Sequence, residues 1–306
     1  MLGQEVRFDG GHKRDPVLSD LLSQHIDWVP VCPEVEVGMG TPREPVNLFV
    51  VGAGVRMIAA DTGRDYTGAM MEWARGRVRE LAGLALCGYV LKKNSPSCGL
   101  DAVKVHFPSG TSERTGRGLF ARVLLEEMPW LPAEEEDTLA NPDVLDSFLE
   151  RAVALRRLHD LSARGLTART LIQFHSAHKM SLLARSRVAY ESLGRLVAAA
   201  GNQDASHLHE TYRRQFMDAM RNAPTRGRHA DVLSHMAGHF KDRLDRNAAG
   251  QLSSAIESYR RGEIARAVPL SLVRSHAERL GIEYVAGQTY LEPPLLGVRL
   301  GSDPAI

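Results

Sequence analysis

Cysteine is scarce in this chain, and long apolar runs are missing. The 306 residues include 3 Cys, too few for a disulfide framework in a chain of this length. No apolar stretch reaches the ~18 residues of a membrane-spanning helix, and no signal peptide opens the sequence. We therefore expect a protein of the reducing cytoplasm that does not enter a membrane.

Charge is balanced over the whole chain but not within each part of it. The formal net charge is +1, yet Lys and Arg number 18 up to residue 160 and 20 after it, against 24 and 13 acidic residues. The first part therefore carries −6 (18 minus 24) and the second +7 (20 minus 13). The length favours two domains, which we expect at 1–161 and 166–306, joined by the short segment 162–165.

The first part alternates short apolar runs with helical patterns, which is typical of βα units on a mainly parallel sheet. We therefore predict an α/β, Rossmann-like domain. The expected strands lie at 46–51, 55–59, 84–91 and 103–106, and the expected helices at 66–81, 118–128 and 143–160.

The second part has helical period almost throughout and few β-branched residues. Apolar residues recur three and four apart, and glycine or proline stands near the ends of the periodic segments. We predict an all-α helical bundle with helices at 170–200, 204–222, 228–246, 251–261 and 270–280.

Two of the thiols stand in polar loops beside a proline. Cys32 lies in a Cys-Pro-Glu segment and Cys98 in a Ser-Pro-Ser-Cys-Gly segment. A proline fixes the local backbone, which suits a reactive or metal-ligating sulfur. Strand-like runs at 28–31 and 88–91 precede the two loops, so we expect both thiols at the carboxyl edge of the sheet, where open α/β sheets bind ligands. The alternative is two buried, inert cysteines.

Several motifs around these thiols resemble those of the bacterial thiouracil desulfidases, in the order of that family. The matching segments are Leu2–Gly3, Val6–Lys13, Val31–Val35, Gly38–Pro45, Asp61–Gly63, and Lys92 with Asn94–Gly99. The resemblance covers residues 2–107. It implies a [4Fe–4S] cluster held by three cysteines, with its fourth iron open to the sulfur of a small thiolated pyrimidine.

The first cluster cysteine of that family is not in this sequence. Family members open with Cys-Leu-Leu-Gly, whereas this chain reads Met1-Leu2-Gly3, so the ligand would fall one residue before Met1. Either the true start lies upstream, which the intact motif from Leu2 onward favours, or the chain has lost a ligand. The resemblance leaves Cys32 and Cys98 as cluster ligands. Cys87 lies in an apolar run and is expected to be structural.

The resemblance also implies roles in a desulfuration. Glu34 would activate water or carry a proton to the pyrimidine ring, and Ser95 would hold the ring or the developing charge. Further candidates for substrate contact, some of which could instead serve the scaffold, are Arg7, Asp9, His12, Arg43 and Ser97. The expected reaction is the non-redox conversion of a 2-thiouracil-like base to the oxo base and hydrogen sulfide. The alternative is a non-enzymatic sensor or adaptor with an incomplete cluster site.

The second part resembles a YbgA-like domain of unsettled role, through segments 174–179, 190–194, 233–238, 259–262 and 288–293. His175 with His178, and His235 with His239, have spacings that suit zinc on one helix face. Nothing in the sequence brings the two pairs together, so we expect solvated or capping histidines. The basic surface leaves tRNA or another nucleic acid open as a partner, although no helix-turn-helix or aromatic series is present.

Overall fold

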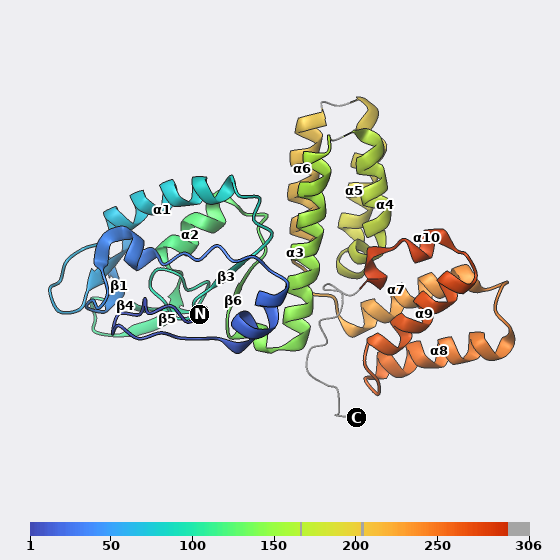
Figure 1. Cartoon of the computed structure of the whole chain (residues 1–306), viewed down its shortest axis with the longest axis horizontal. Helices are drawn as coiled ribbons and strands as arrows, with labels where there is room; N and C mark the ends of the chain where they lie inside the picture. The colour runs from blue at the N-terminus through green and yellow to red at the C-terminus, as the bar shows by residue number, and fades with distance from the viewer. Residues whose placement is uncertain (166, 203–204, 293–306) are drawn as a thin grey trace. The chain divides into compact units, whose positions relative to one another are not determined.

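A computed structural model of the chain describes residues 1–165, 167–202 and 205–292. It divides into two compact units, of which the first holds Met1–Arg156 and the second begins at Arg157, inside helix α3 (Pro142–Ala163). The first unit is α/β and the second is helical, which confirms the predicted fold class (Figure 1). The expected second domain includes residues 166 and 293–306, which lie outside the described residues.

Strands of the first unit form two sheets. The larger has the order β2-β1-β4-β5, and the smaller pairs β3 with β6. The strands are β1 (Val46–Val51), β2 (Gly54–Ala59), β3 (Tyr89–Leu91), β4 (Val103–His106), β5 (Ser112–Gly116) and β6 (Ala133–Glu135). Pairing is parallel for β1 with β4 and for β3 with β6, and antiparallel for the other two pairs. The strands are thus mixed in direction, not mainly parallel as expected.

Short connections explain the antiparallel pairs. A tight turn at Gly52, which has a φ of 61°, joins β1 to β2. The turn from β4 to β5 is closed by the Phe107 N–H, which donates to the Thr111 carbonyl at 2.9 Å. Links this short allow only antiparallel pairing, whereas the partners in each parallel pair are separated in the chain by a helix.

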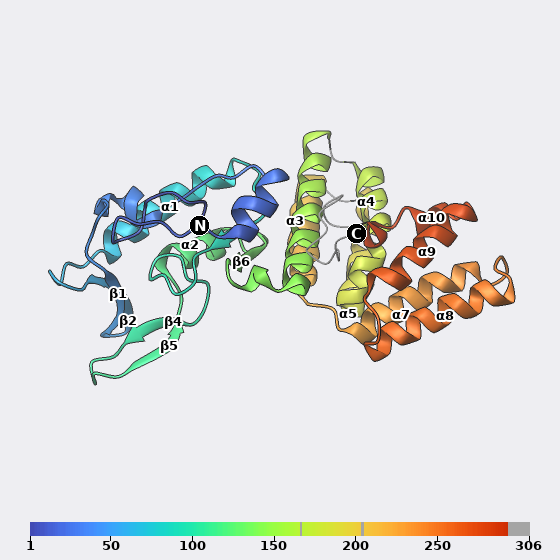
Figure 2. The ribbon, with the colours of Figure 1, turned by 60° about the horizontal axis from the view of Figure 1, so that its bottom comes forward.

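Helices α1 (Thr67–Ala82) and α2 (Leu119–Glu127) lie side by side in the first unit (Figures 1 and 2). Both confirm predicted helices to within two residues at each end. The buried stripe of α1 has spacings of four, four and three residues, as an amphipathic helix requires, and consists of Met70, Ala74, Val78 and Leu81.

The segment before β1 contains short helical turns and irregular backbone. The turns are Val17–Leu21, Leu22–Gln24 and Val35–Met39. The strand expected at 28–31 is absent, so the prediction that Cys32 follows a strand was wrong. Pro30 and Pro33 remove two backbone donors from this stretch, which therefore cannot join a ladder as a regular strand.

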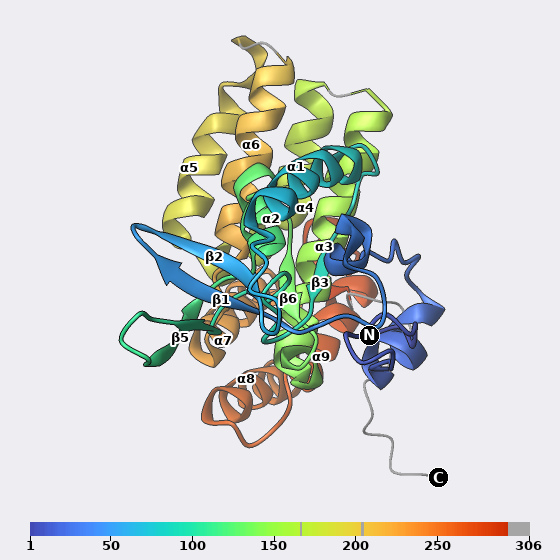
Figure 3. The ribbon, with the colours of Figure 1, turned by 90° about the vertical axis from the view of Figure 1, so that its left-hand side faces the viewer.

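The described part of the second unit is helical, as predicted. Its helices are α4 (Ala168–Arg185), α5 (Arg187–Ala198), α6 (Ala205–Met220), α7 (Arg226–Ala237), α8 (Arg246–Arg261), α9 (Ala267–Arg279) and α10 (Glu283–Ala286). Helices α5 and α6 are neighbours (Figure 3). In the described ranges, no helix has the length and apolarity needed to cross a bilayer.

Two predicted helices end earlier than expected. Ser186 is extended, and its hydroxyl accepts a hydrogen bond from the Ala189 N–H at 3.2 Å, which caps α5 and divides the expected helix 170–200. The helix expected at 228–246 ends at Ala237. Residue 204, the expected start of another helix, lies outside the described residues.

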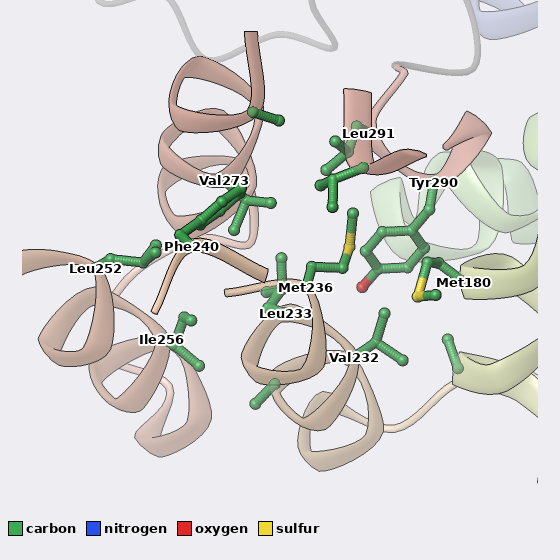
Figure 4. Packing of buried hydrophobic residues seen from close by; sticks show 14 of the residues in the cluster. Met180, Val232, Leu233, Met236, Phe240, Leu252, Ile256, Val273, Tyr290 and Leu291 are labelled. Carbon is green, nitrogen blue, oxygen red and sulfur yellow. The ribbon is translucent and has the colours of Figure 1, made fainter. Parts of the chain in front are cut away.

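An apolar core holds the helices of the second unit together. It gathers side chains from α4, α7, α8 and α9 and from the turns Gly238–Phe240 and Thr289–Leu291, among them Met180, Met236, Phe240, Val273 and Tyr290 (Figure 4). Burial of this apolar surface is the main source of stability for such a helical unit.

Two histidines of α4 are buried rather than solvated, so that expectation was wrong for them. His175 is 4% exposed and its Nδ1 lies 3.1 Å from the Tyr212 hydroxyl. His178 is 2% exposed, and its Nδ1 donates to the Phe174 carbonyl at 2.8 Å. Their Nε2 atoms have no hydrogen-bond partner among the described residues. The other pair, His235 and His239, is exposed as expected.

We expect the second unit to lose stability in mild acid. Burial lowers the pKa of His175 to about 4 and that of His178 to about 3. An unfolded chain's histidines titrate near 6.5. From about pH 6.5 down to these folded values the unfolded state binds protons that the folded state does not. As the pH is lowered through this range, the free energy of unfolding should therefore decrease by about 1.4 kcal/mol per pH unit for each histidine. Urea titrations at several pH values can measure this decrease.

A matched pair of variants isolates this effect. His178→Asn retains an amide donor near the Phe174 carbonyl but removes the titrating ring, so the pH slope should become shallower. His235→Asn, at an exposed position, should leave the slope unchanged. Equal slopes in wild type and His178→Asn would show that His178 does not cause the loss of stability in acid.

Candidate functional site

A cavity of about 400 Å³ opens in the first unit. Its wall includes six of the residues singled out in the sequence, namely Arg7, Cys32, Glu34, Arg43, Ser95 and Cys98. The other lining residues come from the chain start, the beginning of β1, and β3 with the loop that follows it. This volume is within the range of small-molecule pockets, so both thiols and the carboxylate face one space of ligand size.

The Cys98 loop is shaped by Ser95. The Ser95 hydroxyl accepts hydrogen bonds from the Ser97 N–H at 3.3 Å and the Cys98 N–H at 3.1 Å. The Ser95 carbonyl accepts from the Gly99 N–H at 2.8 Å. Just before the loop, Asn94 has a φ of 59°, a left-handed conformation that Asn tolerates better than most residues. The side chain and backbone of Ser95 thus fix the direction of the thiol.

The start of α2 packs directly on this loop. The Leu119 N–H donates to the Pro96 carbonyl at 3.0 Å, and the Ala121 N–H donates to the Ser97 carbonyl at 3.1 Å. Amides of a first helical turn have no partner inside the helix, and here the loop supplies their acceptors. Gly118 permits the close approach, because a Cβ there would lie 2.4 Å from the backbone carbon and oxygen of Ser97.

Cys32 stands at the start of a helical turn that Glu36 closes. The Cys32 carbonyl accepts from the Glu36 N–H at 2.9 Å, and the Glu36 carboxylate accepts from the Cys32 N–H at 3.1 Å. Arg77 of α1 pairs with the same carboxylate at 3.2 Å. The Cys32 sulfur lies 3.9 Å from the Val6 carbonyl, so the second thiol is also set in a defined position.

Glu34 connects the two thiol segments. One carboxylate oxygen, Oε2, accepts from Arg43 through Nε at 3.0 Å and through Nη2 at 2.6 Å. The other, Oε1, accepts from the Ser97 hydroxyl and lies 3.4 Å from that of Ser95. The side chains of Arg43 and Glu34 are only 6% and 16% exposed. This ion pair therefore lies in the wall of the cavity with little screening by solvent.

A second buried carboxylate lies near the chain start. Glu136 is 1% exposed and accepts from the Lys92 ammonium and from the Lys93 N–H at 2.7 Å. Burial alone would raise the pKa of Glu136, but these hydrogen bonds outweigh it and lower the pKa. Burial also lowers the pKa of the Met1 amine, and Glu136 acts against that shift. Met1 and Lys92 both line the cavity, so the first residue lies in its wall.

The two thiols and Glu34 interact electrostatically. Burial raises the pKa of the Cys98 thiol well above its usual value, and the charges of Glu34 and Cys32 act in the same direction. The hydrogen bond to Ser95 and the charge of Lys92 oppose them. A thiol in such surroundings stays protonated at neutral pH unless a cation binds beside it.

Some predicted residues lie elsewhere. Asp9 and His12 are exposed and outside the cavity wall; Asp9 instead accepts from Arg7 and from the Gly11 N–H at 3.0 Å, as in an ordinary turn. Arg7 lines the cavity. Ser97 is fully buried outside the wall and binds Glu34. The structure therefore gives no support to Asp9, His12 or Ser97 as substrate contacts.

Arg43 has the scaffold contacts that were the alternative to a substrate contact, whereas Cys87 differs from expectation. Arg43 does line the cavity, but its guanidinium is engaged with Glu34, with the Val6 carbonyl and with the Gly40 carbonyl, the last two at 3.0 Å. Cys87 is half-buried, not buried, although it is outside the cavity wall as predicted.

The donors present match a [4Fe–4S] cluster only in part. Such a cluster with one open iron needs three protein thiolates, and the cavity offers Cys32 and Cys98. Over the described residues, no group of three or more His, Cys, Asp and Glu gathers as a metal site. Met1 lies in the cavity wall, so a residue attached before Met1 would be next to the cavity. Two thiols therefore line the cavity, and Met1 lies in the same wall.

The sequence did not indicate every residue that shapes the site. Gly118, Glu36 and Glu136 were missed, as was Tyr89, which lines the cavity. Gly118 comes directly before a helical pattern, where a glycine indicates close backbone approach. Glu36 follows Cys32 by four residues, a spacing typical of a helical turn. No local pattern indicated Glu136, because its partner Lys92 is 44 residues away.

These features define an α/β domain with a thiol-lined small-molecule pocket, followed by a helical domain. The model of the 2-thiouracil desulfurase family matches residues 1–136, and that of a family of unknown function (DUF1722) matches residues 179–294. The chain thus joins an N-terminal 2-thiouracil desulfurase domain to a C-terminal DUF1722, YbgA-like domain.

Individual proteins are similar to parts of the chain. The uncharacterized protein YbgA of Escherichia coli K12 is 32% identical over 157 residues, which is 50% of this chain and 93% of that protein. The uncharacterized protein YbbK of Bacillus subtilis 168 is 32% identical over 127 residues, 40% of this chain and 83% of that protein. The solved [4Fe-4S]-dependent thiouracil desulfidase TudS is 27% identical, covering 45% of this chain and 87% of that one, with a TM-score of 0.37.

Gly118→Ala should disturb the Cys98 loop. The new Cβ would meet backbone atoms of Ser97, which cannot rotate away, and overpacking of this kind costs about 1–3 kcal/mol. Thermal unfolding should therefore begin at a lower temperature. Gly76→Ala is the control: it lies in α1 with nothing within 4 Å of an added Cβ, and should stabilise by up to about 1 kcal/mol. A Gly118→Ala protein as stable as wild type would contradict this prediction, because the Cys98 loop would then have shifted without cost.

Proposed function

We propose that the first unit is an iron–sulfur-dependent desulfidase that converts a small thiolated pyrimidine, such as 2-thiouracil, to the oxo base. Water replaces sulfur at the ring carbon, so 2-thiouracil and water give uracil and hydrogen sulfide with no change in oxidation state. One observation carries the proposal: Cys32, Cys98, Glu34 and Ser95 line the same cavity. The match of residues 1–136 to the 2-thiouracil desulfurase family supports the choice of substrate class.

The thiols would hold the cofactor. Cys32 and Cys98 supply two thiolates, and the third would come from a residue directly before Met1, which borders the cavity. A cluster bound there supplies a soft Lewis acid for the sulfur of the substrate. Binding requires Cys98 to lose its proton, and nearby Lys92 favours the thiolate.

Ser95 would orient the attacking water, and Glu34 would take its proton. Arg43 occupies Glu34 Oε2 and leaves Oε1 toward the serines. Ser97 is buried, whereas Ser95 reaches the cavity, so Ser95 can orient the attacking water or the ring. Glu34 then takes the proton of the water, directly or through the Ser95 hydroxyl, and returns it to the departing sulfur or the ring nitrogen.

The cluster assignment predicts that iron binding depends on one added residue. A full-length protein with Cys placed before Met1, reconstituted anaerobically, should bind about four irons per chain and absorb broadly in the visible range. The same protein with Ser placed there should bind iron weakly, and so should Cys-extended proteins carrying Cys32→Ser or Cys98→Ser. Cys87→Ser should keep full iron, because Cys87 is outside the cavity wall. If the Cys32→Ser and Cys98→Ser proteins bound as much iron as the Cys-extended protein, the proposed cluster site would be wrong.

The carboxylate assignment predicts a loss of turnover without loss of cofactor. Glu34→Gln keeps the shape of the side chain but removes its basicity, so turnover of 2-thiouracil should fall by a factor of about 10²–10⁴. Iron content should stay the same. Some stability should be lost as well, since Arg43 is left without its buried counterion. Glu113→Gln, at an exposed position outside the cavity, is the control. If Glu34→Gln turned over 2-thiouracil at the wild-type rate, Glu34 would not be the base.

A further inference from the structure

Tyr89 places a hydroxyl-bearing ring in the wall of the thiol cavity. It is the first residue of β3, and its N–H donates to the Pro132 carbonyl at 2.8 Å, which anchors the backbone at that point. None of the hydrogen bonds found among the described residues involves its hydroxyl. A tyrosine that is mostly buried normally finds a partner for this group. The hydroxyl is therefore available to a ligand in the cavity.

Aromatic neighbours hold the ring in one orientation. The ring centroid of Tyr89 lies 5.9 Å from that of Phe120, which is fully buried on α2. Phe120 in turn lies 5.6 Å from Trp73 of α1. Ring pairs at these distances add to the stability gained from burial. A hydroxyl on so constrained a ring is a preorganised donor, which loses little side-chain entropy when a ligand binds.

Several charged groups act on the Tyr89 hydroxyl. Burial raises the pKa of Tyr89 well above its usual value, and the charge of Cys98 is the next largest cause, followed by that of Glu36. Arg77 opposes the shift, and Cys32 adds to it. The hydroxyl thus lies within electrostatic reach of both thiols. Glu36 and Arg77 are paired with each other.

We propose that Tyr89 is a further catalytic residue of this pocket, whose hydroxyl donates a hydrogen bond to the sulfur of the bound thiopyrimidine. This inference rests on the proposed function, because the thiols that share the cavity wall with Tyr89 are where the substrate sulfur would bind. When the carbon–sulfur bond breaks, its electron pair moves onto sulfur. A donor already in place there stabilises the transition state more than the ground state. Tyr89 transfers no proton and remains a neutral phenol throughout.

Tyr89→Phe removes only the hydroxyl and keeps the ring against Phe120. In the Cys-extended, reconstituted full-length protein, we expect unchanged iron content, kcat for 2-thiouracil about tenfold or more lower, and KM within about threefold of wild type. Loss of one donor aimed at developing charge costs up to about 10²–10³ in kcat, and sulfur is a weaker acceptor than oxygen. Tyr66→Phe, outside the cavity wall, is the matched control and should behave as wild type.

A second readout does not need the cluster. In the iron-free full-length protein, the thiocarbonyl absorption band of bound 2-thiouracil should differ between wild type and Tyr89→Phe, because a hydrogen bond to sulfur shifts that band. An identical band in both proteins, or kcat within twofold of wild type, would overturn the inference. So would a rise in KM with kcat unchanged, since the donor would then serve ground-state binding of another ring atom. A wild-type protein that is inactive on thiopyrimidines but shows the band shift would instead refute the proposed function alone.

Discussion

The buried carboxylate of Glu34 is the contact on which the candidate site depends. Arg43 binds one of its oxygens and also the Val6 carbonyl, which lies beside the sulfur of Cys32. Ser97, one residue before Cys98, binds the other oxygen. Glu34 thereby joins the chain start and both thiol segments, which are far apart in the sequence. Removal of one partner from a buried ion pair typically costs about 3–5 kcal/mol, so this contact contributes much of the stability that keeps these segments together.

The same arrangement limits what Glu34 can do in chemistry. Arg43 takes up one oxygen of the carboxylate, and the remaining oxygen is aimed at the serines of the Cys98 loop. That loop is supported from behind by the first amides of α2, at a contact only glycine permits at position 118. Rigidity of this kind favours a precise position for a bound ligand or water.

Features with a local signal were predictable from the sequence. The apolar run 46–51 and the patterns at 66–81 and 118–128 became β1, α1 and α2, because amphipathic period and β-branched runs determine such elements. The Cys-Pro-Glu and Ser-Pro-Ser-Cys segments indicated a shared site, and they line one cavity. Strands β5 and β6 were missed because their residues are polar or acidic and are placed by pairing with β4 and β3. Long-range pairs such as Glu34 with Arg43 depend on the tertiary fold, and no periodicity reports them.

Anomalous scattering at the iron edge, from crystals of the anaerobically reconstituted full-length protein with Cys before Met1, would test the central claim most directly. The account predicts one iron cluster in the first unit, with Cys32, Cys98 and the added cysteine as its protein ligands and one iron facing Glu34 and Ser95 without a protein ligand. Iron bound at Cys87 or within the helical unit, or a cluster that only one of Cys32 and Cys98 touches, would contradict it.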